Sequence, residues 1–177
     1  MKKLLLIACC LIFSLCSIGK TTHTFEVGKG EFLLDGKPFV IKAAELHYLR
    51  IPHQYWEHRI MMCKALGMNA VCAYVFWNAH EQNEGEFCFS GNMDVARFIS
   101  LCQKHGMWVI LRPGPYCCAE WEMGGLPWWL LKSQKGEKPI ALRTLDSRFM
   151  KAAARFERKL AEQLALRVFS QNVLLPS

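Results

Sequence analysis

The chain has 177 residues, of which 52% are hydrophobic, and its formal net charge is +7. This length and composition suit one domain with a packed core and exclude general disorder. The basic residues, such as Lys151, Arg155, Arg158 and Lys159, are scattered over helical faces without interleaved aromatic residues. We therefore expect solvated helix faces and no nucleic-acid partner.

The first 19 residues have the pattern of a Sec-type signal peptide. Lys2 and Lys3 precede an apolar run that ends near Leu15, and the segment Ser17-Ile18-Gly19 places small residues where a signal peptidase cuts. We expect cleavage after Gly19 and export to the periplasm or the extracellular space. Loss of two lysines and no acids would lower the charge from +7 to +5. The run is shorter than the about 20 residues that cross a bilayer, so we expect no transmembrane segment.

Six of the nine cysteines follow the predicted signal peptide and are spread over predicted helices and strands. They form no CxxC pair and no Cys/His set at zinc spacing, so we expect core thiols and no metal. Cys117 and Cys118 are the exceptions, because they lie in an acidic loop. In an exported protein one of them could form a disulfide with a distant part of the fold.

Residues 24–48 predict two or three short strands, with a tight hairpin turn at Asp35-Gly36. The last of these strands is expected over Phe39 to Ala44. It is followed by the polar and aromatic residues Glu45, Leu46, His47 and Tyr48.

The rest of the chain alternates helices and strands. The expected order is a helix from Pro52 to Gly67 with Trp56, Ile60, Cys63, Lys64 and Leu66 at helical spacing, a strand over 69–75, a helix over 93–105, a strand over 107–111 and a helix over 148–165.

Apolar strands that alternate with amphipathic helices predict a parallel sheet with helices packed outside it. Each strand ends in polar or aromatic residues, which favours a (β/α)8 TIM barrel over a nucleotide-binding sheet. No Gly-rich phosphate loop follows any strand, so we expect no nucleotide cofactor. The predicted fold class is α/β, with about the first three βα units of the barrel in this chain.

The segment from Arg112 to Leu131 joins the end of a buried strand to an acidic, aromatic loop. Glu120 and Glu122 lie among several aromatic residues at the carboxyl end of a strand, where α/β proteins bind ligands. Carboxylates accept hydrogen bonds from sugar hydroxyls, and aromatic faces stack on sugar C–H groups. The alternative is a buried tryptophan cluster with solvated acids on its rim.

Three long motifs carry a resemblance to a known family: AELHYLRIP, WEHRIMMCKALGMNAVCAYVFWNAHE and VILRPGPYCCAEWEMGGLPWWLL. Over roughly residues 30–165 the chain closely resembles the amino-terminal part of glycoside hydrolase family 35, whose main activity is β-galactosidase. The resemblance implies a (β/α)8 barrel that releases terminal β-linked galactose from a glycan with retention of configuration. It implies no metal or organic cofactor, and two carboxyl groups about 5–5.5 Å apart.

The resemblance also implies which residues bind galactose: Tyr74, Ala119 and Glu120. Tyr74 would contact the hydroxymethyl and axial hydroxyl side of the sugar, and Glu120 would accept hydrogen bonds from ring hydroxyls. The structural alternatives are a tyrosine bonded to backbone and an exposed glutamate. Three further residues are expected to support the site or form its wall: Asn78, Glu81 and Trp121.

The last residues depart from the family. There the acid/base ends a fourth strand in an Asn-Glu pair and the nucleophile ends the seventh strand, but no residue of LRVFSQNVLLPS, which follows Ala165, matches either position. We expect residues 20–177 to be an incomplete and inactive part of a catalytic domain, caused by a frameshift, an early stop or a shortened gene model. The sequence gives no indication of an oligomeric state.

Three other interpretations remain open. Two of the residues Glu45, Glu120 and Glu122 could act as a catalytic pair, since all three lie at strand ends. The chain could be a weak sugar-binding module without catalysis that uses Tyr74, Glu120 and Trp121. It could also be a non-functional fragment that aggregates, because three barrel units leave two sheet edges unpaired.

Overall fold

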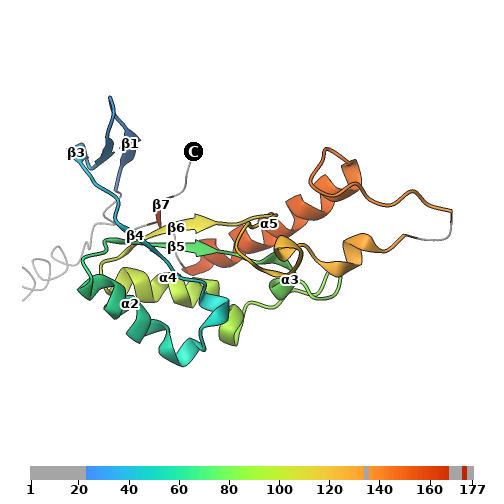
Figure 1. Ribbon diagram of the computed structural model, residues 1–177, viewed down its shortest axis with the longest axis horizontal. Helices are drawn as coiled ribbons and strands as arrows, with labels where there is room; N and C mark the ends of the chain where they lie inside the picture. Colours follow the sequence, from blue (N-terminus) through green and yellow to red (C-terminus); the bar gives the residue numbers. More distant parts are fainter. Residues whose placement is uncertain (1–22, 134–135, 168–172, 175–177) are drawn as a thin grey trace, which may run out of the picture.

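The computed structural model describes residues 23–133, 136–167 and 173–174 (Figure 1). The strands are β1 (Phe25–Val27), β2 (Phe32–Leu34), β3 (Lys37–Pro38), β4 (Ala43–Glu45), β5 (Ala70–Tyr74), β6 (Trp108–Arg112) and β7 (Val173–Leu174). The α-helices are α2 (Trp56–Ala65), α3 (Trp77–His80), α4 (Val95–Lys104) and α5 (Ser147–Arg167). The 3-10 helices are η1 (Tyr48–Arg50), η2 (His53–Tyr55), η3 (Gly91–Met93), η4 (Glu122–Gly125) and η5 (Trp128–Leu131).

Four parallel strands form the main sheet in the order β4-β5-β6-β7, which is also their order in the chain. Helices α2, α4 and α5 each join one strand to its parallel neighbour, as such pairing requires. Helix α4 packs between α2 and α5, and Figure 1 shows α2 and α4 lying along one face of the strands. The expected α/β fold with a parallel sheet is confirmed.

The fourth strand was not expected from the sequence. Strand β7 pairs in parallel with β6, with Val173 opposite Val109 and Leu174 opposite Ile110. Helix α5 is therefore a complete crossover that returns the chain to the sheet. Sequence reasoning missed β7 because two residues are too few to show a periodicity.

The main hydrophobic core lies between the sheet and the three long helices. Because side chains alternate along a strand, Val71 and Ala73 of β5 face the helices while Tyr74 faces the other side. The core is made of these strand residues together with the following buried helix residues: Trp56, Ile60, Phe98, Ile99, Phe156 and Leu160. No helix among the described residues is both long and apolar enough to cross a membrane.

On the face of the sheet opposite the helices, the register of β5 and β6 places side chains of the two strands at the same level, in layers. Tyr74 lies opposite Arg112 at the carboxyl end, and Cys72 lies opposite Ile110 one layer below. Such layers fill the interior of a (β/α)8 barrel. The layer nearest the carboxyl ends is therefore formed by a tyrosine and an arginine.

The small antiparallel sheet β1-β2-β3 lies beyond the amino ends of the parallel strands (Figure 1). Asp35 and Gly36 have φ angles of 52° and 72°, so the predicted hairpin turn is confirmed. The Phe39 ring packs edge-on against Trp108 at 6.2 Å and so connects this hairpin to the start of β6.

The strand expected over Phe39 to Ala44 is shorter than predicted and covers only Ala43–Glu45. The reason is Asn69, whose side chain accepts a hydrogen bond from the Lys42 amide at 2.8 Å and donates one to the Val40 carbonyl at 2.8 Å. A side chain thus satisfies backbone groups that a strand partner would otherwise bond.

Two helix residues lie differently from the prediction. Leu66, assigned to the helical apolar pattern, is 75% exposed, because α2 ends at Ala65 and Gly67 turns the chain with a φ of 84°. Arg155, assigned to a solvated face, forms an ion pair with the fully buried Glu81 at 2.6 Å.

The six cysteines in the described part of the chain are free thiols. Cys117 is buried, and its thiol donates to the Val75 carbonyl at 3.6 Å, whereas Cys118 is exposed. Burial raises the pKa of Cys117 to about 11, so this thiol is protonated at neutral pH.

One histidine lies inside the core with both ring nitrogens bonded. His80 Nδ1 donates to the Cys88 carbonyl at 2.9 Å, which leaves Nε2 to accept the Tyr48 hydroxyl at 2.6 Å. Burial lowers the pKa of His80 from its ordinary 6.5 to about 4, although the bond to Cys88 opposes this shift. The buried imidazole is therefore neutral.

We predict that His80 makes the fold sensitive to acid. Between pH 6.5 and about 4 the unfolded chain binds a proton that the folded chain does not, so the free energy of unfolding should fall by about 1.4 kcal/mol per pH unit. Above pH 6.5 this residue does not make the free energy of unfolding depend on pH. The free energy of unfolding, measured by urea denaturation at several pH values in this range, should depend less steeply on pH in His80→Gln than in His58→Gln. His58 is an exposed histidine and serves as the control. Equal slopes in the two variants would contradict the prediction.

Candidate active site

The carboxyl ends of β4, β5 and β6 bring polar side chains together from three distant parts of the chain. His47, just after β4, bonds through Nε2 to the Glu45 carboxylate at 2.6 Å. Its ring lies edge-on to Tyr74 at 5.3 Å. Arg112, at the end of β6, donates to the Tyr74 hydroxyl and places its guanidinium 4.2 Å from the centre of the Tyr74 ring.

Tyr74 is arranged to donate a hydrogen bond to a ligand. Arg112 can only donate, so the Tyr74 oxygen is the acceptor of that bond and its own O–H remains available. Burial raises the pKa of Tyr74, and the Arg112 charge opposes this shift. The hydroxyl is therefore protonated at neutral pH.

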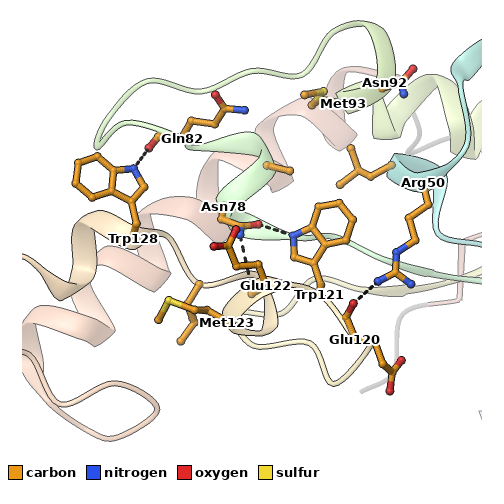
Figure 2. Close-up of a pocket in the computed structure, with 13 residues that line it drawn as sticks. Arg50, Asn78, Gln82, Asn92, Met93, Glu120, Trp121, Glu122, Met123 and Trp128 are labelled. Atoms are coloured by element: carbon orange, nitrogen blue, oxygen red, sulfur yellow. Dashed lines mark hydrogen bonds between the residues drawn. The ribbon is translucent and has the colours of Figure 1, made fainter.

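Ala119 and Glu120 reach the same place from the loop after β6. Ala119 is buried in a small cluster with Tyr74, Phe76 and Cys117. Glu120 is exposed and has a φ of 48°, in the left-handed region. Within the described residues no group is hydrogen-bonded to the Glu120 carboxylate, and Figure 2 shows it pointing away from the neighbouring cavity.

Trp121 is fixed in orientation by contacts on its face and its edge. Its ring stacks on Phe76 with the centroids 4.3 Å apart and the planes 8° from parallel. Its Nε1 donates to Asn78 Oδ1 at 2.9 Å (Figure 2). Helix α3 and the loop after β6 are joined through this residue.

A cavity of about 890 Å³ lies beside this stack (Figure 2). Its wall is lined by polar, charged, aromatic and aliphatic residues: Leu49, Arg50, Asn78, Ala79, Gln82, Asn92, Met93, Glu120, Trp121, Glu122, Met123, Leu126 and Trp128. Tyr74 is not part of this wall.

The structure brings most of the predicted site residues together. Tyr74 and Ala119 belong to the same buried cluster, and Glu120 follows Ala119 directly. Asn78 and Trp121 are hydrogen-bonded neighbours on the cavity wall.

Glu81 lies elsewhere. Its buried carboxylate accepts bonds from Trp77 Nε1 at 2.6 Å, the Gly85 amide at 2.8 Å and Arg155 at 2.6 Å. It therefore connects α3 to α5 inside the core.

Sequence reasoning missed three residues that shape the site: Arg50, Phe76 and Arg112. Phe76 and Arg112 each lie at or just past a strand end, as Tyr74 does, but only Tyr74 was indicated by the family resemblance. Arg50 has no such signal. Its importance depends on backbone groups 69 and 70 residues away. In the described part of the chain no three His, Cys, Asp or Glu side chains lie close enough to hold a metal ion.

Comparison with known proteins then decides the family. The model of glycosyl hydrolases family 35 matches residues 31–173. The chain belongs to this family. The family 35 match extends past Ala165, where the resemblance seen in the sequence ended, to the residue at which β7 begins.

Curated relatives in family 35 include β-galactosidases. The chain is 45% identical over 141 residues to a β-galactosidase of Xanthomonas manihotis, which covers 80% of this chain and 23% of that protein. It is 46% identical over 136 residues to a Mus musculus β-galactosidase, covering 77% and 20%. It is 42% identical over 140 residues to the Homo sapiens β-galactosidase-1-like protein 3, covering 79% and 21%. The chain thus spans between 20% and 23% of the length of these relatives.

Solved structures of other glycosidases share the fold. A GH5_18 protein from Streptomyces cattleya, crystallised with GlcNAc, superimposes with a TM-score of 0.55 at 18% identity, over 74% of this chain and 29% of that one. An exo-β-1,4-mannosidase from Opitutaceae bacterium strain TAV5 gives a TM-score of 0.53 at 17% identity, over 75% and 23%. At this identity the likeness concerns the fold, and it agrees with an arrangement of the (β/α)8-barrel type.

The loop that carries Glu120 depends on one glycine, which gives a testable prediction. Gly124 has a φ of 62°, and a Cβ there would lie 2.2 Å from a Tyr116 ring carbon. Gly124→Ala should therefore lower the free energy of unfolding by about 2–4 kcal/mol, through left-handed strain and overpacking together. The measurement is the urea midpoint.

Gly91→Ala is the matched control. Gly91 has a similar φ of 58°, but a Cβ there would meet no atom of the described residues within 4 Å. Only the left-handed strain of about 1 kcal/mol should appear there. Equal losses in both variants would show that the Tyr116 contact has no influence.

Proposed function

We propose that this chain forms the amino-terminal part of the catalytic barrel of a retaining β-galactosidase and that Tyr74, Ala119 and Glu120 bind the terminal galactose. The observation that carries the proposal is that Tyr74 and Ala119 belong to one buried cluster beyond the carboxyl ends of β5 and β6, and that Glu120 directly follows Ala119. Glycosidases of the barrel type bind substrate at this end of the strands. The identity to curated β-galactosidases supports galactose as the sugar.

The two polar residues suit complementary hydrogen bonds to a sugar. Tyr74 has a free O–H, because its oxygen already accepts from Arg112. Glu120 offers acceptor oxygens to ring hydroxyls. Ala119, buried in the same cluster as Tyr74, determines where the Glu120 main chain begins. A sugar held between a donor and an acceptor is fixed in orientation as well as in place.

The bond-breaking step requires two further carboxyl groups. In a retaining reaction one carboxylic acid protonates the glycosidic oxygen while the other, as carboxylate, attacks the anomeric carbon and forms a glycosyl-enzyme. Water then attacks that carbon, and the first group removes its proton. The double displacement leaves the configuration unchanged.

We assign neither reacting carboxyl to the glutamates of this chain. Glu45 is bonded to His47 at 2.6 Å, and Glu120 is assigned to sugar hydroxyls. Glu122 lines the cavity beside Trp121. The reacting groups are proposed to lie on the later strands of a complete barrel. The 177-residue polypeptide alone should therefore bind galactosides weakly and hydrolyse none.

A second candidate function is sugar binding without hydrolysis. The observation that favours it is the cavity beside Trp121, whose wall combines aromatic faces with amide groups. These are the groups that bind sugars in many proteins. It would replace the first proposal if completion of the barrel produced binding but no turnover.

The activity prediction uses a chimera in which residues 31–173 replace the matching part of the Xanthomonas manihotis β-galactosidase. The chimera should hydrolyse a nitrophenyl β-galactoside, whereas the 177-residue chain should release no product above buffer. Tyr74→Phe and Glu120→Gln should each raise the KM of the chimera about 10-fold or more, since each leaves a sugar hydroxyl without its partner. Turnover by the 177-residue chain that Glu120→Gln abolishes would show that Glu120 is itself a reacting carboxyl.

We also propose that the protein is exported and that a signal peptidase cleaves it after Gly19. Residues 1–19 lie outside the described residues, so the support is the sequence pattern alone. Amino-terminal sequencing of secreted material should give Lys20 as the first residue. A cytoplasmic product that retains Met1 would contradict export.

A further inference from the structure

Arg50 connects the end of the first barrel strand to the loop that carries Glu120. Its Nη2 donates to the Ala119 carbonyl at 2.8 Å and to the Glu120 carbonyl at 2.6 Å. Its Nη1 donates to His47 Nδ1 at 3.0 Å. The guanidinium also lies 5.3 Å from the centre of the Trp121 ring, and Figure 2 shows it directed at the Glu120 main chain.

The two carbonyls can share one donor only because of the local backbone conformation. Successive carbonyls point in opposite directions along an extended chain, but to the same side in a helical conformation of either hand. Glu120 has a φ of 48°, in the left-handed region that residues other than glycine seldom adopt. Such a conformation persists where surrounding contacts enforce it. Arg50 supplies two of those contacts.

The guanidinium of Arg50 is also held by His47 through its other terminal nitrogen, Nη1. An arginine donates and never accepts, so His47 Nδ1 is the acceptor of its bond and the ring proton lies on Nε2, directed at Glu45. A chain of hydrogen bonds thus runs from Glu45 through His47 and Arg50 to the carbonyls of Ala119 and Glu120. It connects the carboxyl end of β4 to the loop after β6.

We infer that Arg50 is a positioning residue that holds Glu120 in the galactose site through the Ala119–Glu120 main chain. The inference rests on the proposed function, because it assigns a purpose to the place where Glu120 is held. A lysine could not replace Arg50, since a single ammonium cannot reproduce the planar donors that reach His47 and two carbonyls together.

The kinetic test uses the chimera described above. Arg50→Gln and Arg50→Lys should each raise KM for the nitrophenyl β-galactoside by about 10- to 100-fold, with a smaller change in kcat and an unchanged pH profile. The matched control is Arg59→Gln, which alters an exposed arginine of α2 and should leave both constants unchanged. Arg50 variants that match the parent while Glu120→Gln is impaired would overturn the inference and leave the proposed site intact.

A double-mutant cycle separates positioning from a general effect on the fold. If Arg50 acts through Glu120, then Arg50→Gln should change KM less than about 3-fold in a Glu120→Gln background. If the double variant's change in KM equals the product of the two single changes, Arg50 acts independently of Glu120, which overturns the inference. A Glu120→Gln chimera that matches the parent would instead overturn the proposed galactose site.

A structural measurement on the full 177-residue chain does not depend on activity. The loop is held by the Cys117 amide bonded to the Gly124 carbonyl at 2.8 Å and by the Gly124 amide bonded to the Trp121 carbonyl at 2.9 Å. Hydrogen exchange of residues 117–124 should be at least about 10-fold faster in Arg50→Gln than in Arg59→Gln, with α4 unchanged. Equal exchange of this loop in the two variants would overturn the inference.

Discussion

The parallel register of β5 on β6 is the constraint on which the rest of the site depends. It places Tyr74 opposite Arg112, and both on the face away from the helices. Side chains alternate along a strand, so a slip of one residue would turn Tyr74 into the helix layer and bring Val75 to the ligand side. The buried positions Val71 and Ala73, which pack on the helices, prevent that slip. Core packing and ligand binding therefore specify the same register.

Polar and aromatic contacts inside the protein fix the loops around the site relative to the sheet and the helices. Glu81 bonds to Trp77 and Arg155 and so connects α3 to α5, while Trp121 bonds to Asn78 and stacks on Phe76. Apart from the bond between Glu81 and Trp77, each contact joins the segment after β5 to a segment that follows β6 in the chain. A buried carboxylate without Arg155 would be strongly unfavourable, so the ion pair also fixes how α5 docks. The loops that surround the site are thereby connected to the helix layer.

Sequence reasoning predicted what depends on local pattern and missed what depends on distant backbone groups. The three long helices and the strands β5 and β6 followed from periodicity, and Glu120 was singled out by its place after a buried strand. Tyr74 was predicted from the family resemblance. The start of β4 did not, because the Asn69 side chain replaces a strand partner there. The contacts of Arg50 did not either, because a carbonyl has no signature in the sequence. Glu81 was placed near the site by its neighbours in the sequence, but it lies at the end of the helical turn α3 and is buried in the core.

The contrast between the main chain and the side chain of Glu120 explains how a loop can hold a ligand-binding carboxylate rigidly. The Glu120 carbonyl is bonded to Arg50, and the Ala119 side chain before it is buried. In the described part of the chain, by comparison, no group is bonded to the carboxylate. A carboxylate paired with an internal cation would have to break that pair before it accepted hydroxyls, and this would cost binding energy. By tying the backbone through carbonyls instead, the fold orders Glu120 and keeps its acceptor oxygens available for a ligand.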